Sequence, residues 1–142
     1  MSIDYGAKRT GIAVTDPLQI IANGLATVQT SKLDDFIKEY INKENVECIV
    51  VGLAKQTNGE DSENMRRITP FVNKLKKTYP EIRVEFFDER FTSVLAHRAI
   101  IESGINKKSR QNKALVDQIS ATIILQDYLE ARKNNFNNYN II

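Results

Sequence analysis

Three acidic residues that are far apart in the chain lie where a carboxylate is hard to explain by folding alone. Asp4 ends a predicted strand, Glu89 follows another, and Asp117 interrupts the apolar face of a predicted helix. An ionised carboxylate in apolar surroundings is costly without a positive partner. If the three converge, a cation must separate them, and hard divalent cations take oxygen ligands and hold phosphates for hydrolysis. The pattern predicts a Mg²⁺ or Mn²⁺ site whose ligands and catalytic groups are Asp4, Glu89 and Asp117, and phosphodiester chemistry.

Two adjacent carboxylates, Asp88 and Glu89, compete for the middle position of this set. Adjacent strand residues point to opposite faces of a sheet, so one of the two is expected in the site. Glu89 is favoured because its longer side chain reaches inward from just beyond the strand. Asp88 is then expected to brace the backbone or Arg90. A charged surface turn is the alternative interpretation of this segment.

Basic residues flank the acidic positions. Two of them follow the tight turn at Gly6, and a basic loop leads toward Asp117. Such a rim would neutralise the phosphates of a nucleic acid, although a charge run is more often a solvated surface. An Asp-x-Gly turn also binds ATP phosphates in kinase-like folds, so this turn alone does not distinguish a nuclease from a kinase-like protein. The residues predicted to bind substrate are Lys8, Arg9, Arg90, Lys107, Lys108 and Lys113.

Length and composition bound the remaining possibilities. The chain has 142 residues and a net charge of +2, which fits one domain and is too weakly basic to indicate nucleic acid by itself. Cys48 is the single cysteine, so no intrachain disulfide forms; it is predicted to be a buried strand residue in a protein of a reducing compartment. No segment has the ~20 apolar residues of a membrane span, and no leader precedes the first strand. A cytoplasmic location is expected.

The hydrophobic pattern predicts strands that first form an antiparallel meander and then alternate with helices. These strands are expected at 2–4, 10–15, 24–30, 47–53 and 83–88. Helices are expected at 33–41 with Ser31 as cap, at 65–79 with a kink or a new start near Pro70, at about 92–102, and at 113–133.

This order predicts an α/β fold with a mixed five-stranded sheet and helices on both faces. Residues 1–133 are expected to form one domain, followed by an Asn-rich, frayed tail at 134–142. Asp4 and Glu89 would then lie at the carboxyl ends of their strands, where open α/β sheets bind ligands.

Several motifs, taken in order, resemble the YqgF/RuvX family. They are Asp4-Tyr5-Gly6 with residues 8–14 and 16–18, then 51–53, 88–93 and 113–117. The resemblance covers about residues 2–128. It implies a ribonuclease H-like fold related to the RuvC resolvases and a role in trimming the 5′ end of precursor 16S rRNA, with an older assignment as Holliday junction resolvase. The family's acidic positions carry over to Asp4, Glu89 and Asp117. The chain departs from the family at Ala54, where a proline is usual.

The favoured interpretation is a metal-dependent endonuclease that acts on structured RNA, as a monomer or homodimer. A nuclease that cuts branched DNA would use the same acidic residues. A nucleic-acid-binding assembly factor with little catalysis is an alternative of another class. An actin-like ATPase or sugar kinase is disfavoured, because 142 residues with six glycines leave no room for a second domain and a second phosphate loop.

Overall fold

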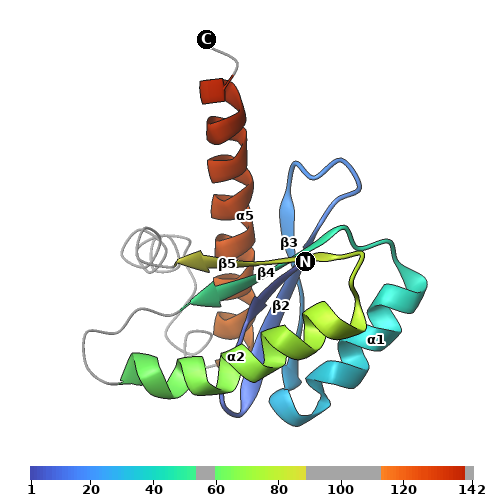
Figure 1. Cartoon of the computed structure of the whole chain (residues 1–142), viewed down its shortest axis with the longest axis vertical. Helices are drawn as coiled ribbons and strands as arrows, with labels where there is room; N and C mark the ends of the chain where they lie inside the picture. The colour runs from blue at the N-terminus through green and yellow to red at the C-terminus, as the bar shows by residue number, and fades with distance from the viewer. Residues whose placement is uncertain (54–59, 89–112, 140–142) are drawn as a thin grey trace.

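The computed structural model describes residues 1–53, 60–88 and 113–139 (Figure 1). Its strands are β1 (Ser2–Asp4), β2 (Arg9–Thr15), β3 (Ala22–Gln29), β4 (Cys48–Leu53) and β5 (Arg83–Asp88). Its helices are α1 (Leu33–Lys43), which follows the 3₁₀ turn η1 (Thr30–Lys32), α2 (Glu60–Thr78) and α5 (Lys113–Tyr139). The helix predicted at about 92–102 lies outside the described residues.

The strands form one mixed sheet in the order β3-β2-β1-β4-β5. β1 pairs antiparallel with β2, and β2 with β3, whereas β1, β4 and β5 are parallel. The predicted mixed sheet, with its antiparallel meander first, is confirmed. Since parallel strands end on the same side, Asp4 of β1 and Asp88 of β5 both lie at one edge, which we call the carboxyl edge.

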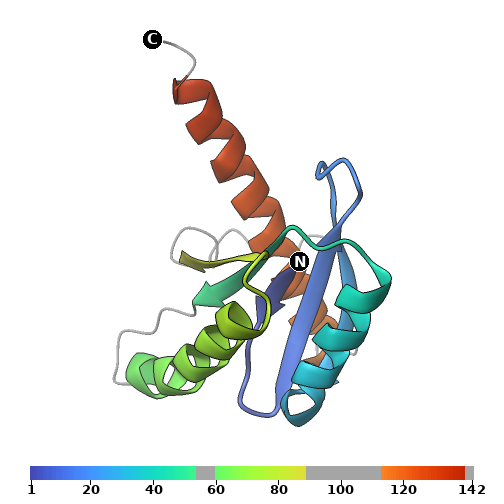
Figure 2. The ribbon, with the colours of Figure 1, turned by 45° about the vertical axis from the view of Figure 1, so that its right-hand side comes forward.

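Helices cover both faces of this sheet, as predicted (Figures 1 and 2). The face of α1 and α2 holds the main apolar core, in which Ile3 and Ile12 of the sheet pack against Leu33 and Val72. The other face is covered by α5 and holds a smaller cluster of Ala13, Ala22, Ala121 and Leu125. Large branched residues dominate the first cluster, whereas three of the four residues in the second are alanines.

Three local predictions differ from the structure. Ser31 does not cap α1, because it lies within η1 and the cap position is Lys32, without a side-chain cap bond. Pro70 lies inside α2, which is a single helix from Glu60 to Thr78, so the alternative of a new helix beginning there is wrong and the kink stays a prediction. Helix α5 does not end at Lys133 but continues to Tyr139, since no glycine or proline interrupts it.

Small residues in β1 and β2 let α5 lie directly on the sheet. A Cβ atom built on Gly11 would come closer than 3.0 Å to the backbone carbonyl of Asp117, a contact that real Cβ atoms essentially never make. Beside it, the buried hydroxyl of Ser2 donates a hydrogen bond of 2.6 Å to the carbonyl oxygen of Ala121. The backbone of α5 is thus fixed against β1 and β2 at two neighbouring points.

A first prediction follows from this contact. Gly11→Ala should lower the free energy of unfolding by about 1–3 kcal/mol, the usual cost of overpacking, because the helix backbone cannot move aside cheaply. Gly24→Ala is the matched control, since its Cβ would meet side-chain atoms of α5 that can adjust, the nearest at 3.3 Å. Urea unfolding of both variants measures the difference. Equal stability of the two variants would contradict the close approach at Gly11.

Candidate functional site

The side chain of Asp4 lies on the face of the sheet that α5 covers. Asp4 pairs with Gly11 across the β1–β2 ladder, and residues directly opposite in an antiparallel pair project to the same face. Gly11 faces the backbone of Asp117 on α5. Ser2, two residues before Asp4 and so on the same face, bonds to α5 as well. Two observations therefore agree on the placement of Asp4.

Asp117 reaches the same region from the first turns of α5. Its carboxylate oxygen Oδ2 accepts a hydrogen bond of 3.0 Å from Nε of Arg9, the first residue of β2. The Asp117 side chain is 24% exposed and that of Arg9 is 41% exposed, so the ion pair is partly solvated. Asp4 and Asp117, separated by more than a hundred residues in sequence, share one face at the carboxyl edge, and Arg9 is paired with Asp117.

The turn that carries the two early cations is held by Thr30. The hydroxyl of Thr30 donates to the carbonyl of Gly6 at 2.6 Å, and its backbone N–H donates to the carbonyl of Lys8 at 3.0 Å. Lys8 is exposed beside this anchored turn, and Arg9 begins β2. Hydrogen bonds from Thr30, the first residue of η1, therefore hold the backbone of the turn that carries both cations.

Other predicted site residues fall outside the part of the chain that the structure describes. These are Glu89, Arg90, Lys107 and Lys108. Asp88, which precedes Glu89, is the last residue of β5 and pairs with Leu53 at the carboxyl edge. Lys113 begins α5. Within residues 1–53, 60–88 and 113–139, no group of three His, Cys, Asp or Glu side chains lies close enough to hold a metal ion.

Farther along, α5 is tied to β5 by a hydrogen-bonded tyrosine. The hydroxyl of Tyr128 donates a short hydrogen bond to the carboxylate of Glu85, and the ring packs edge-on against Phe87 with centroids 6.2 Å apart. Burial raises the pKa of the Tyr128 phenol, and the bond to Glu85 raises it further. This contact, which no sequence pattern indicated, links the helix of Asp117 to the strand that precedes Glu89.

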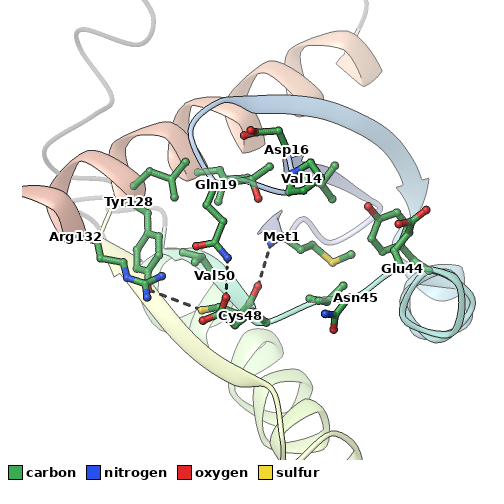
Figure 3. Close-up of a pocket in the computed structure, with 17 residues that line it drawn as sticks. Met1, Val14, Asp16, Gln19, Glu44, Asn45, Cys48, Val50, Tyr128 and Arg132 are labelled. Atoms are coloured by element: carbon green, nitrogen blue, oxygen red, sulfur yellow. Dashed lines mark hydrogen bonds between the residues drawn. The ribbon is translucent and has the colours of Figure 1, made fainter.

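A cavity of about 350 Å³ lies at the opposite edge of the sheet, beside the amino ends of β1 and β4 (Figure 3). Met1, Cys48 and Tyr128 line it, and the amino group of Met1 donates to the carbonyl of Cys48 at 3.0 Å. Cys48 was predicted to be buried, but it is only partly buried because its side chain faces this cavity. The cavity does not include Asp4 or Asp117 and is separate from the acidic residues.

Three antiparallel strands are followed by two strands that run parallel to β1, and an aspartate ends β1. This arrangement defines a ribonuclease H-like domain. The sequence profile of the RuvX family, described as Holliday junction resolvase, matches residues 1–131. The chain belongs to this family.

Similar sequences from several bacteria share one name. A protein of Phocaeicola vulgatus named "Putative pre-16S rRNA nuclease" is 67% identical over 133 residues, which are 94% of this chain and 96% of the relative. Proteins of the same name from Bacteroides thetaiotaomicron and Flavobacterium johnsoniae are 65% and 53% identical, over the same shares of both chains. No helix among the described residues is long and apolar enough to cross a membrane.

A second prediction concerns Tyr128. Its raised pKa means that the folded state holds the phenol proton more tightly than the unfolded state does. Stability should therefore be full below about pH 10 and fall as the pH rises further, because the unfolded chain releases this proton first. Tyr128→Phe should cost about 1–2 kcal/mol at pH 7, since Glu85 loses its donor, and should lose less stability than the parent between pH 9 and pH 11. Urea unfolding across that range is the measurement, and identical alkaline slopes would contradict the assignment.

Proposed function

We propose that this chain is a metal-dependent endonuclease that hydrolyses phosphodiester bonds, and that it processes the 5′ end of precursor 16S rRNA in the cytoplasm. The observation that supports the proposal is that Asp4 and Asp117 lie on the same face of the sheet at the carboxyl edge. Membership of the RuvX family and the name of the relatives support the reaction class.

The proposed metal is Mg²⁺ or Mn²⁺, held by Asp4 and Asp117 with Glu89 as a third ligand. Carboxylate oxygens are the ligands that these hard cations prefer. The guanidinium of Arg9 bound to Asp117 supports a cation site here, because it indicates that this edge of the sheet attracts positive charge. A bound divalent cation would supply an activated water and would stabilise charge on the leaving oxygen.

The remaining groups are proposed to orient the substrate. Lys8 is exposed next to the β1–β2 turn, within the stretch that Thr30 anchors, and is suited to meet a backbone phosphate. Arg9 has the planar fork that binds a phosphate through two hydrogen bonds. Phosphate contacts of this kind position a nucleic acid without selecting its sequence. Further phosphate contacts are proposed for Arg90, Lys107, Lys108 and Lys113.

The choice of RNA over DNA rests on the relatives and not on the acidic residues. Carboxylate-held cations hydrolyse either backbone, so the same site serves a junction-cutting nuclease. The description of the family as Holliday junction resolvase favours that second candidate function. Cleavage of a precursor rRNA fragment and of a four-way DNA junction, side by side, separates the two.

A third prediction tests the role of Asp117. Asp117→Asn keeps the shape of the side chain but removes a ligand charge, so Mg²⁺- or Mn²⁺-dependent cleavage should fall by about two orders of magnitude or more. Folding stability should change by no more than about 1 kcal/mol, since the lost ion pair is partly exposed. Asp127→Asn, the same change further along α5, is the matched control and should keep the parent rate.

Cleavage assays on both substrates, with each metal and with neither, provide the readout. A purified Asp117→Asn variant that cleaves at the parent rate would contradict the proposed site. If the parent binds the rRNA fragment but cleaves neither substrate under any metal condition, the protein is instead a nucleic-acid-binding assembly factor.

A further inference from the structure

The ion pair between Arg9 and Asp117 puts a cation on a carboxylate that is proposed to bind metal. Nε of Arg9 lies 3.0 Å from Oδ2 of Asp117, so one of the two oxygens of this carboxylate is engaged by the guanidinium. A divalent cation bound to the same carboxylate would be repelled by this guanidinium. The guanidinium and the proposed metal therefore compete for the same carboxylate group.

The two partners differ in how easily they can move. The backbone of Asp117 is pressed against Gly11, and a neighbouring turn of α5 is fixed by the bond from Ser2 to Ala121. Arg9 instead ends in a long side chain that is 41% exposed, and an ion pair this exposed is weak. If the pair breaks, the long arginine side chain can therefore move farther than the short side chain of Asp117, whose backbone is held in place.

We propose that Arg9 is a resident counter-cation, which neutralises Asp117 until a divalent cation displaces it and which then binds the phosphate backbone of the substrate. The inference rests on the proposed metal site. A guanidinium is repelled by a divalent cation on the same carboxylate, and its fork of donors then suits a nearby phosphate. Loading of the metal and binding of the nucleic acid are thereby linked through one side chain.

This linkage has two measurable consequences. Arg9 lowers the affinity for the metal, because the metal must first break the ion pair. Arg9 also couples the binding of metal and nucleic acid positively. Metal binding releases Arg9 for the phosphate, and by reciprocity phosphate binding removes the competitor of the metal. A residue that only contacted the substrate would have no effect on the affinity for metal alone.

The first experiment is calorimetric titration of Mn²⁺ alone into the full chain and three variants. Arg9→Gln should bind Mn²⁺ about three- to tenfold more tightly than the parent, since a weak competitor and a nearby positive charge are removed. Lys8→Gln removes the same charge one residue away, outside the ion pair, and should change the affinity by less than about twofold. Asp117→Asn should weaken binding by about tenfold or more, because a charged ligand is lost. Thermal unfolding of each variant verifies that it is folded.

The outcomes separate this inference from the function on which it rests. If Asp117→Asn weakens Mn²⁺ binding while Arg9→Gln leaves it unchanged or weaker, the metal site stands and the counter-cation is wrong. If Asp117→Asn has no effect on Mn²⁺ binding, the proposed metal site fails, and this inference fails with it. If Arg9→Gln and Lys8→Gln gain the same affinity for Mn²⁺, the change in net charge explains the gain. The proposed displacement of Arg9 by the metal is then wrong.

The second experiment measures the coupling. The affinity of a short single-stranded RNA is determined by fluorescence anisotropy with and without Ca²⁺, a hard cation that takes the same oxygen ligands. The parent should bind the RNA more tightly when Ca²⁺ is present, and Arg9→Gln should lose most of that gain. Arg9→Lys, which retains the charge, should recover part of it. A gain in Arg9→Gln equal to that of the parent would show that Arg9 does not pass to the phosphate.

Discussion

The close approach of α5 to the first two strands is the constraint on which the rest of the site depends. Gly11 leaves no space between β2 and the backbone of Asp117, and Ser2 bonds to the next turn of the helix. Because Asp4 pairs with Gly11, this one contact brings together the end of the first strand and the start of the last helix. Because the residues on this face are small, less apolar surface is buried there, but these residues determine where the two carboxylates lie.

The contact also creates an electrostatic conflict that the chain must resolve. Two acidic side chains on one face favour a nearby cation, and Arg9, which pairs with Asp117, provides one from within the chain. Residues that assemble a functional site often oppose stability, because the groups are arranged for a ligand and not for each other. The main apolar core lies on the other face of the sheet, so stability and chemistry are largely divided between the two sides.

Hydrophobic periodicity was sufficient to predict the sheet, because the strands are short and sharply bounded. β1 and β5 have the predicted limits, and the helices of both faces follow the predicted stripes. The sequence could not reveal the partner of Arg9, since that contact joins residues 108 positions apart. The same holds for Tyr128 and Glu85, which meet only once α5 has crossed the sheet.

Only part of the predicted site lies within the described residues, and the role of each of its residues stays a prediction. Asp4 and Asp117 were singled out because a carboxylate at each position lacked a structural reason, and the fold brings both to one face. Small residues at positions 2, 11 and 13 were an available signal for the helix contact, since alternate strand positions share a face. Glu89 and the basic loop stay predictions, because they lie outside the described residues.

The most direct test of the account is to locate bound Mn²⁺ by its paramagnetic broadening of backbone amide signals in solution. The account predicts that broadening at low Mn²⁺ concentration is strongest at Asp4, Gly11 and Asp117. Residues of the cavity at the opposite edge, where Asp16 and Glu47 also offer carboxylates, should keep sharp signals. Broadening centred on that cavity, with sharp signals at Gly11 and Asp117, would contradict the account.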